Sequence, residues 1–119
     1  MIRTENLTKQ FGGKMAVNAL NIEVHEGEFF CFLGPNGAGK TTTIRMLTGL
    51  LKPTSGRALV GGLDIQEDPV RTKRLLGYIP DTPFLYERLT GREFLRFVAG
   101  LYQMDEAETT RKSEELLEL

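Results

Sequence analysis

The residues best suited to chemistry lie in one glycine-rich run, Gly34-Pro35-Asn36-Gly37-Ala38-Gly39-Lys40-Thr41-Thr42. This run fits the phosphate-binding pattern G-x-x-x-x-G-K-[ST], in which the backbone wraps around a phosphate with its N–H groups turned inward. Lys40 would place its positive charge on the outer phosphates, and the hydroxyl of Thr41 would be a ligand for Mg²⁺. The run therefore predicts a binding site for a nucleoside triphosphate.

The residues on either side of this run predict a strand before the loop and a helix after it, which is the context that the motif requires. The apolar residues 29–33 are typical of a strand covered on both faces of a parallel sheet, and Cys31 is expected to be a core thiol. Helical spacing follows the loop, and Pro53 ends the helix at about Leu51. The competing interpretation is a glycine-rich turn between two core elements.

Further strands are predicted around this central unit. Residues 2–7 and 17–24 alternate in part between apolar and polar types, and Gly12-Gly13 between them favours a turn. We therefore expect a pair of half-exposed strands. Residues 57–60 and 76–80 are short apolar segments that also predict strands.

Three helix starts are visible in the remainder of the chain. Asp68 before Pro69 combines a capping carboxylate with proline at the first helical position, and this helix should end near residue 77. Thr90 and Glu93 form a capping box, and Asp105 begins a further, mostly polar helix. The apolar stripe after Thr90 is explained equally well by packing and by an interaction role.

The composition is that of an ordinary soluble domain. The chain has 119 residues, of which 40% are apolar and 26% are charged, and its net charge is −1. This balance gives no electrostatic reason to expect nucleic acid as a partner. A single cysteine allows no disulfide within the chain, which favours a reducing, intracellular setting. The longest apolar run has five residues, so we expect neither a membrane-spanning helix nor a secretory leader.

The ordered set of motifs resembles the nucleotide-binding domain of ABC transporters. The aromatic residue Phe11 precedes Gly12, the phosphate loop reads GPNGAGKTTT, and a Pro-Thr-Ser-Gly turn follows at 53–56. The segment Leu76-Gly77-Tyr78-Ile79-Pro80-Asp81 is similar to the strand that leads into the family's Q-loop. Residues 85–102 resemble the helical subdomain of the exporter branch, which pairs with separate membrane subunits.

The resemblance implies an α/β fold on a P-loop NTPase core, with N-terminal antiparallel strands and a central strand, loop and helix. We expect residues 1–85 to belong to the ATP-binding core and residues 86–119 to begin a helical subdomain. The family's signature, Walker B and switch-histidine motifs are not found, and the single histidine, His25, precedes the phosphate loop. We therefore expect the N-terminal part of a longer ATPase domain, with an unpaired apolar edge at 29–33 and marginal stability.

The resemblance also implies roles for individual residues, each with a plainer alternative. Phe11 would stack on adenine, or would be a core aromatic residue at a strand end. Val17 would flank the same ring, or would be an ordinary core residue. Asp81 stands where the family has the Q-loop glutamine, and it would bind Mg²⁺ and couple the site to the membrane partner, or would cap a local turn. The phosphates of ATP would be held by Asn36, Gly37, Ala38, Gly39, Lys40, Thr41 and Thr42.

The function implied by the resemblance is that of an ATP-binding subunit, which couples ATP binding and hydrolysis to substrate movement through a transmembrane permease. A second nucleotide-binding domain is expected as a homodimer partner, with the protein cytoplasmic on the inner face of the cell membrane and no nucleic acid bound. Two alternatives stay open: a soluble ABC-type ATPase that acts on nucleic acid or ribosomes, and a non-catalytic nucleotide-binding fragment. Without the water-orienting carboxylate, the chain is expected to bind ATP without useful turnover.

Overall fold

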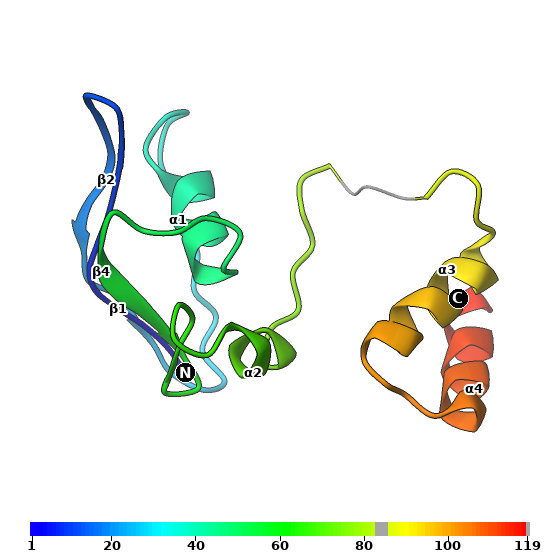
Figure 1. Ribbon diagram of the computed structural model, residues 1–119. Coiled ribbons are helices and arrows are strands. Elements are labelled where there is room, and N and C mark those ends of the chain that lie inside the picture. The colour runs from blue at the N-terminus through cyan, green and yellow to red at the C-terminus, as the bar shows by residue number, and fades with distance from the viewer. Residues whose placement is uncertain (83–85, 119) are drawn as a thin grey trace. The chain divides into compact units, whose positions relative to one another are not determined.

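The computed structural model describes residues 1–82 and 86–118 of the chain. The chain divides into two units, Met1–Ile79 and Pro80–Leu119 (Figure 1). The expected division between residues 85 and 86 adjoins residues 83–85, which lie outside the described residues, so this boundary stays a prediction. Among the described residues, no helix combines the length and the apolar character needed to cross a membrane.

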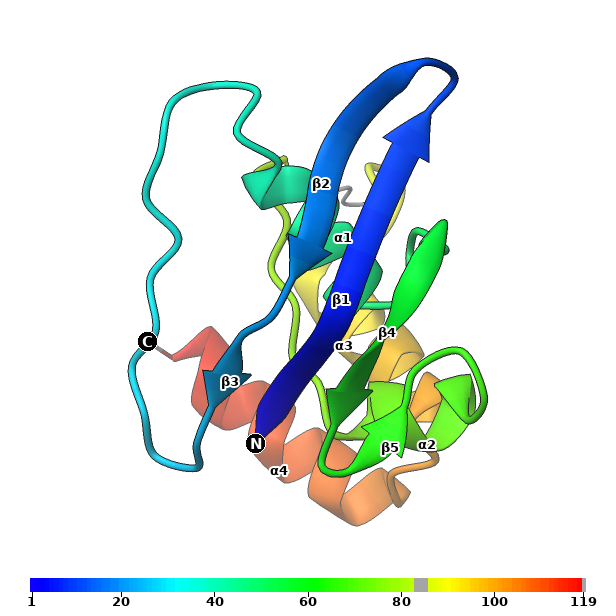
Figure 2. The ribbon, with the colours of Figure 1, turned by 90° about the vertical axis from the view of Figure 1, so that its left-hand side faces the viewer.

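The first unit is built on an antiparallel sheet with the strand order β2-β1-β4-β5 (Figure 2). Its long hairpin joins β1, Ile2–Phe11, to β2, Lys14–Leu20, and confirms the predicted pair of strands with its turn at Gly12-Gly13. Both strands run closer to the turn than predicted. The strand predicted at 57–60 is confirmed as β4, Ser55–Val60, which pairs with β1 and with β5, Leu63–Asp64. The short strand β3, Glu23–Val24, pairs with the start of β1.

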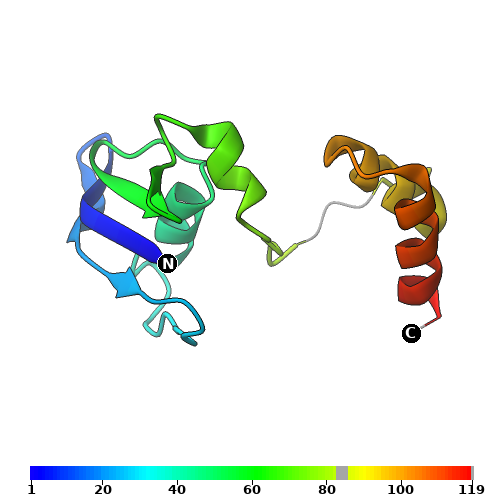
Figure 3. The same ribbon diagram turned by 90° about the horizontal axis from the view of Figure 1, so that it is seen from below.

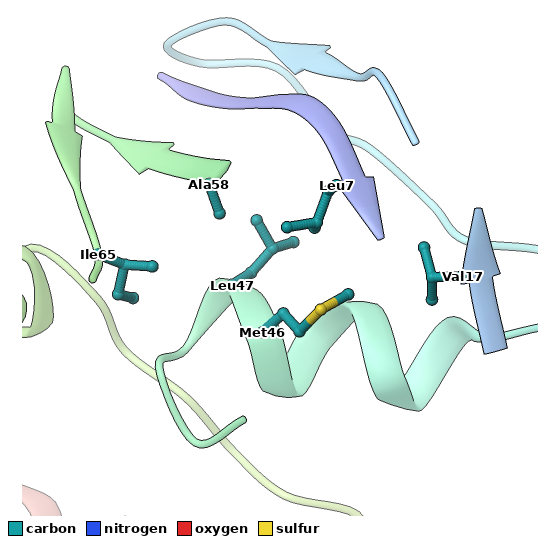
Figure 4. Close-up of a cluster of buried hydrophobic side chains, with 6 residues drawn as sticks. All are labelled: Leu7, Val17, Met46, Leu47, Ala58 and Ile65. Carbon is teal, nitrogen blue, oxygen red and sulfur yellow. The ribbon is translucent and has the colours of Figure 1, made fainter. Parts of the chain in front are cut away.

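One helix packs on this sheet and forms the core of the unit. The helix α1, Lys40–Leu47, follows the glycine-rich run. The buried cluster joins residues of this helix to residues of the sheet and of the segment after it: Met46, Leu47, Leu7, Val17, Ala58 and Ile65 (Figure 4). Leu7 and Met46 are fully buried. Because α1 begins at the glycine-rich run, the burial of Met46 and Leu47 also fixes that run against the sheet.

The helix α1 ends at Leu47, earlier than the predicted end near residue 51. Gly49 adopts the left-handed backbone conformation, with φ +66°. The N–H of Gly49 donates to the Met46 carbonyl at 3.1 Å, and the N–H of Leu50 donates to the Arg45 carbonyl at 2.9 Å. This is a Schellman motif, in which a glycine just after a helix satisfies its last carbonyl groups. Gly49 was therefore the sequence signal for this helix end.

The strand predicted at residues 29–33 is wrong, because this segment is irregular. Phe29 is 94% exposed and Leu33 is 87% exposed, and Cys31 is exposed and not a core thiol. A strand covered on both faces needs hydrogen-bonding neighbours, and the sheet of the described residues places none beside this segment. The apolar composition is real, and Phe32 packs against the core. Composition alone does not make a strand where partners are absent.

The strand predicted at residues 76–80 is wrong for the same reason. This stretch pairs with no strand among residues 1–82, and Ile79 is 89% exposed. The helix before it is confirmed at its start: α2, Pro69–Arg74, has proline in its first turn, and the Asp68 carboxylate accepts a hydrogen bond from the Arg71 N–H at 3.3 Å. This helix ends before the predicted residue 77.

The second unit contains a pair of packed helices, α3, Gly91–Leu101, and α4, Glu106–Leu117 (Figure 3). The predicted capping box of α3 is confirmed. The N–H of Thr90 donates to the Glu93 carboxylate at 2.8 Å, and the N–H of Glu93 donates to the Thr90 hydroxyl at 3.3 Å. Asp105 caps α4 as predicted, since its carboxylate accepts hydrogen bonds from two N–H groups of the first turn. These local signals were readable because the donor and the acceptor lie within three residues of each other.

An ion pair between Arg92 of α3 and Glu114 of α4 joins these two helices. The hydrogen bond from Arg92 holds the pKa of the Glu114 carboxyl below its ordinary value. A carboxyl with a depressed pKa stabilises the fold above its unfolded pKa, and this contribution is lost as the pH falls through the lowered value. We therefore expect Glu114→Gln to lower the melting temperature slightly at neutral pH and to have no effect at about pH 2.

Thermal unfolding followed by circular dichroism at the two pH values measures this difference. Glu118→Gln is the matched control. Glu118 is the C-cap residue of α4 and forms no ion pair among the described residues. The same loss of stability at both pH values would mean that Glu114 acts through something other than its charge.

Candidate phosphate-binding site

The glycine-rich run forms a loop that leads directly into the N-terminus of α1. Gly37 and Gly39 adopt the left-handed backbone conformation, with φ values of +86° and +85°. Residues other than glycine rarely adopt this conformation, because their Cβ atom makes it unfavourable. Gly39 is the N-cap residue of α1, and no side chain caps the helix there. Among the described residues, the N–H groups of Lys40, Thr41 and Thr42 have no hydrogen-bond partner. A helix N-terminus left open in this way favours an anion.

The ammonium group of Lys40 lies within the loop. It donates hydrogen bonds to the carbonyl groups of Gly34 and Pro35, the second at 2.7 Å. The N–H of Ala38 also donates to the Pro35 carbonyl, at 3.2 Å. These bonds close the loop on itself. The loop therefore carries two sources of positive potential, the ammonium group and the helix N-terminus.

A cavity of about 340 Å³ extends from the loop to the turn of the β1–β2 hairpin. It is lined by Phe11, Lys14, Ala16, Asn36, Gly37, Ala38, Gly39, Lys40, Thr41 and Thr42. The structure thus brings the predicted aromatic residue and the predicted phosphate-loop residues 36–42 to one place. The charged residues of this lining are two lysines, with no carboxylate. The cavity is therefore suited to an anion that also carries a flat apolar ring.

The hairpin meets the loop at an irregular point of its ladder. The register between β1 and β2 shifts between the residue pairs on either side of Ala16. A Cβ atom on Gly39 would lie 2.5 Å from the Ala16 carbonyl oxygen, so a side chain at this position would force the backbone to shift. A bulge bends its strand and changes the direction of its residues. Here it allows β2 to contact the phosphate loop directly.

Val17 lies in the core and does not line this cavity. It is 8% exposed and belongs to the buried cluster (Figure 4). Its burial agrees with the alternative of an ordinary core residue, and its predicted place beside the base stays a prediction. Lys14 and Ala16 line the cavity instead, and the sequence interpretation missed both. The sequence pattern did not mark them, because the pairing of Lys14 with Phe11 and the register shift at Ala16 are set by the strand ladder.

The two predicted magnesium ligands differ in position. Thr41 lines the cavity, whereas Asp81 is exposed in the second unit and is not among the lining residues. Among residues 1–82 and 86–118, no group of three or more His, Cys, Asp or Glu side chains could hold a metal ion. A hydroxyl beside a phosphate loop fits Mg²⁺ that arrives with its nucleotide, because Mg²⁺ takes much of its coordination from phosphate oxygens and water. The roles of Thr41 and Asp81 in binding Mg²⁺ stay predictions.

The match to a known protein family identifies the family of this chain. The family model described as ABC transporter matches residues 17–119. The chain belongs to the ABC transporter family.

Individual members of the ABC transporter family are similar over most of this chain. The probable multidrug ABC transporter ATP-binding protein YbhF of Escherichia coli is 47% identical over 102 residues, which cover 86% of this chain and 18% of that protein. The carnitine transport ATP-binding protein OpuCA of Listeria monocytogenes is 40% identical over 121 residues, which cover 100% of this chain and 30% of that protein. A solved ATP-binding subunit of an ABC transporter has a TM-score of 0.83 at 35% identity, with 93% of this chain and 46% of that chain covered.

These similarities confirm the predicted fold class, an α/β ABC ATPase domain of which part is present. The chain spans less than a third of the length of the two curated relatives. The similarity to the solved subunit extends over both the sheet unit and the helices, since it covers 93% of the chain.

Replacement of Gly39 tests whether the ABC-type phosphate loop depends on its contact with β2. Alanine at Gly37 or Gly39 would be strained by the positive φ, but only at Gly39 would the new Cβ meet backbone, the Ala16 oxygen at 2.5 Å. Nothing lies within 4 Å of a Cβ on Gly37. We therefore expect Gly39→Ala to reduce the free energy of unfolding by about 2 kcal/mol more than Gly37→Ala does. Urea denaturation of the two variants measures the difference, and equal losses would contradict a role for the contact.

Proposed function

We propose that the chain binds ATP, with its phosphates on the loop at residues 34–42 and its base on Phe11. The observation that carries the proposal is the cavity that Phe11 shares with residues 36–42. A phosphate loop by itself suits any ligand with a suitable polyphosphate group. An aromatic ring in the same cavity supplies a surface for the base, so the two together favour a nucleotide.

The base would rest on the ring of Phe11. This side chain is 49% exposed, so its ring is accessible to a ligand. Stacking of a base on an aromatic side chain contributes about 1–3 kcal/mol and tolerates different bases. We therefore expect weak selectivity among nucleoside triphosphates.

The phosphates would lie at the N-terminus of α1. The N–H groups of Lys40, Thr41 and Thr42 are free to donate, and the ammonium group of Lys40 lies beside them. Charge-assisted hydrogen bonds of this kind are stronger than neutral ones. Mg²⁺, when bound, would neutralise part of the phosphate charge, with the Thr41 hydroxyl as a ligand and Asp81 as a further one.

For the whole protein, we propose that ATP binding and hydrolysis drive substrate movement through a transmembrane permease. Both curated relatives have transport names, but their cargoes differ, so the family supports transport without supporting a particular cargo. A second copy of the nucleotide-binding domain would cover the exposed loop residues 36–38. The protein would then lie on the cytoplasmic face of the membrane through its permease. The net charge of −1 gives no support to nucleic acid as a partner.

Removal of the Lys40 ammonium group tests the phosphate site. We expect Lys40→Ala to weaken the binding of ATP and Mg²⁺ by at least tenfold, because hydrogen bonds to charged groups contribute about 1.5–3 kcal/mol. Isothermal titration calorimetry measures the affinity. Lys112→Ala is the control, since Lys112 is exposed on α4 and pairs with Glu108 of the same helix at 3.6 Å. Equal binding by the wild type and Lys40→Ala would contradict the assignment.

Hydrolysis is expected to be slow in the chain as it stands. Phosphoryl transfer depends on the positioning of the attacking water, and the cavity lining has no carboxylate for this task. We expect phosphate release to stay below about 0.1 s⁻¹ at saturating ATP, against the 1–10³ s⁻¹ typical of enzymes. A phosphate-release assay measures this rate. Faster turnover that Lys40→Ala abolishes would show that the chain supplies its own water-positioning group.

A further inference from the structure

The side chain of Lys9 connects the ring of Phe11 to the segment that follows α1. Its Nζ atom lies over the Phe11 ring, 5.2 Å from the ring centroid. The same atom donates a hydrogen bond to the main-chain carbonyl of Lys52 at 2.6 Å. The ammonium group is therefore held by a fixed acceptor while it contacts the ring. A cation in this position is attracted to the negative face of the ring.

The contact with Lys9 leaves the ring available to the cavity. Phe11 lines the cavity, and Lys9 is not among the lining residues. Lys14, the residue paired with Phe11 across the hairpin, is the lysine on the cavity side. The two lysines beside Phe11 therefore differ: Lys14 lines the cavity, whereas Lys9 contacts the ring and is not part of the lining.

The acceptor of Lys9 belongs to a segment that is tied to β1 by further bonds. The N–H of Thr54 donates to the Thr8 carbonyl at 2.9 Å, and the N–H of Gln10 donates to the Thr54 hydroxyl at 3.1 Å. The Lys52 carbonyl is thus held near the end of β1. Without such support, an aromatic side chain that is 49% exposed beside a glycine turn would have several rotamers open to it. A ligand would then have to order the ring when it binds.

We propose that Lys9 is a positioning residue for the base-binding ring, which it holds in place through Phe11 without touching the nucleotide. This proposal rests on the proposed binding of ATP. It deepens that function by separating the residues that act on the base from those that act on the phosphates. Loss of Lys9 should weaken the binding of only those ligands that carry a base. Loss of Lys40 should weaken the binding of every ligand that carries phosphates.

The test compares ATP with inorganic triphosphate, which has the phosphates and no base, each titrated with Mg²⁺ into the full chain. Lys9→Met keeps most of the apolar stem and removes the charge. We expect it to weaken ATP about two- to fivefold, the effect of one exposed cation–π contact. The affinity for inorganic triphosphate should not change, because the experiment is run at about 0.15 M salt, where a distant exposed charge is screened. Lys9→Arg should restore the ATP affinity, since arginine also donates to a carbonyl and binds an aromatic face.

Two further variants separate positioning from a general effect on charge or folding. Lys112→Met removes one exposed lysine from α4 and should change neither affinity. In a Phe11→Leu background the ring is absent, so the addition of Lys9→Met should cause no further loss of ATP affinity. This comparison remains informative if Lys9→Met lowers stability by itself, because the same loss would then occur in both backgrounds.

Several results would overturn the proposal. Unchanged ATP affinity in Lys9→Met would show that the contact does not position the ring. Equal weakening of the binding of ATP and inorganic triphosphate would show a general effect on charge or folding, as would an additive loss of ATP affinity in the Phe11→Leu background. Failure of the wild type to bind either probe would instead contradict the proposed function. If inorganic triphosphate binds and ATP binds no more tightly, the result would support the assignment of the phosphate site and contradict the assignment of Phe11 as the base site.

Discussion

The contact between Gly39 and the Ala16 carbonyl is the constraint on which the site depends. It leaves no room for a Cβ atom, so the phosphate loop and β2 touch backbone to backbone. Because α1 begins immediately after Gly39, this contact also sets where Met46 and Leu47 reach the sheet. The same hairpin carries Phe11, which pairs with Lys14 beside the turn, two residues from Ala16. This one close approach therefore sets the positions of the helix N-terminus, the core and the hairpin that carries the aromatic ring.

The parts of the site that were predictable are those encoded locally. Residues 36–42 are contiguous, and their glycines permit the conformation that the loop adopts, so the motif alone identified them. Phe11 needed more than local information, because only the fold brings it to the loop, and it was found through resemblance to a family. Lys14 and Ala16 were missed because the choice of a strand face depends on the register, which a bulge alters at this point.

The errors in the fold have a common physical cause. Residues 29–33 and 76–80 have the composition of buried strands, yet a strand is completed by hydrogen bonds to segments distant in sequence. The pattern of residues says nothing of whether those partners are in place, and among residues 1–82 they are not. Helix starts were predicted correctly because Asp68, Thr90 and Asp105 bond within their own first turns. The signal for the end of α1 is equally local, because Gly49 lies just after the helix and ends it in the left-handed conformation.

The bonds of Lys40 set a limit on what the phosphate loop gains from a ligand. Its ammonium group already donates to the Gly34 and Pro35 carbonyls, so a phosphate must replace these acceptors or share the ammonium group with them. The contribution of Lys40 to affinity is therefore the difference between bonds to charged oxygens and bonds to neutral carbonyls. The N–H groups of Lys40, Thr41 and Thr42 give up no protein partner among the described residues, so their contribution is not reduced in this way. The ammonium group of Lys40 thus contributes to the shape of the loop and to ligand binding, whereas the N–H groups at the helix N-terminus would contribute to ligand binding alone.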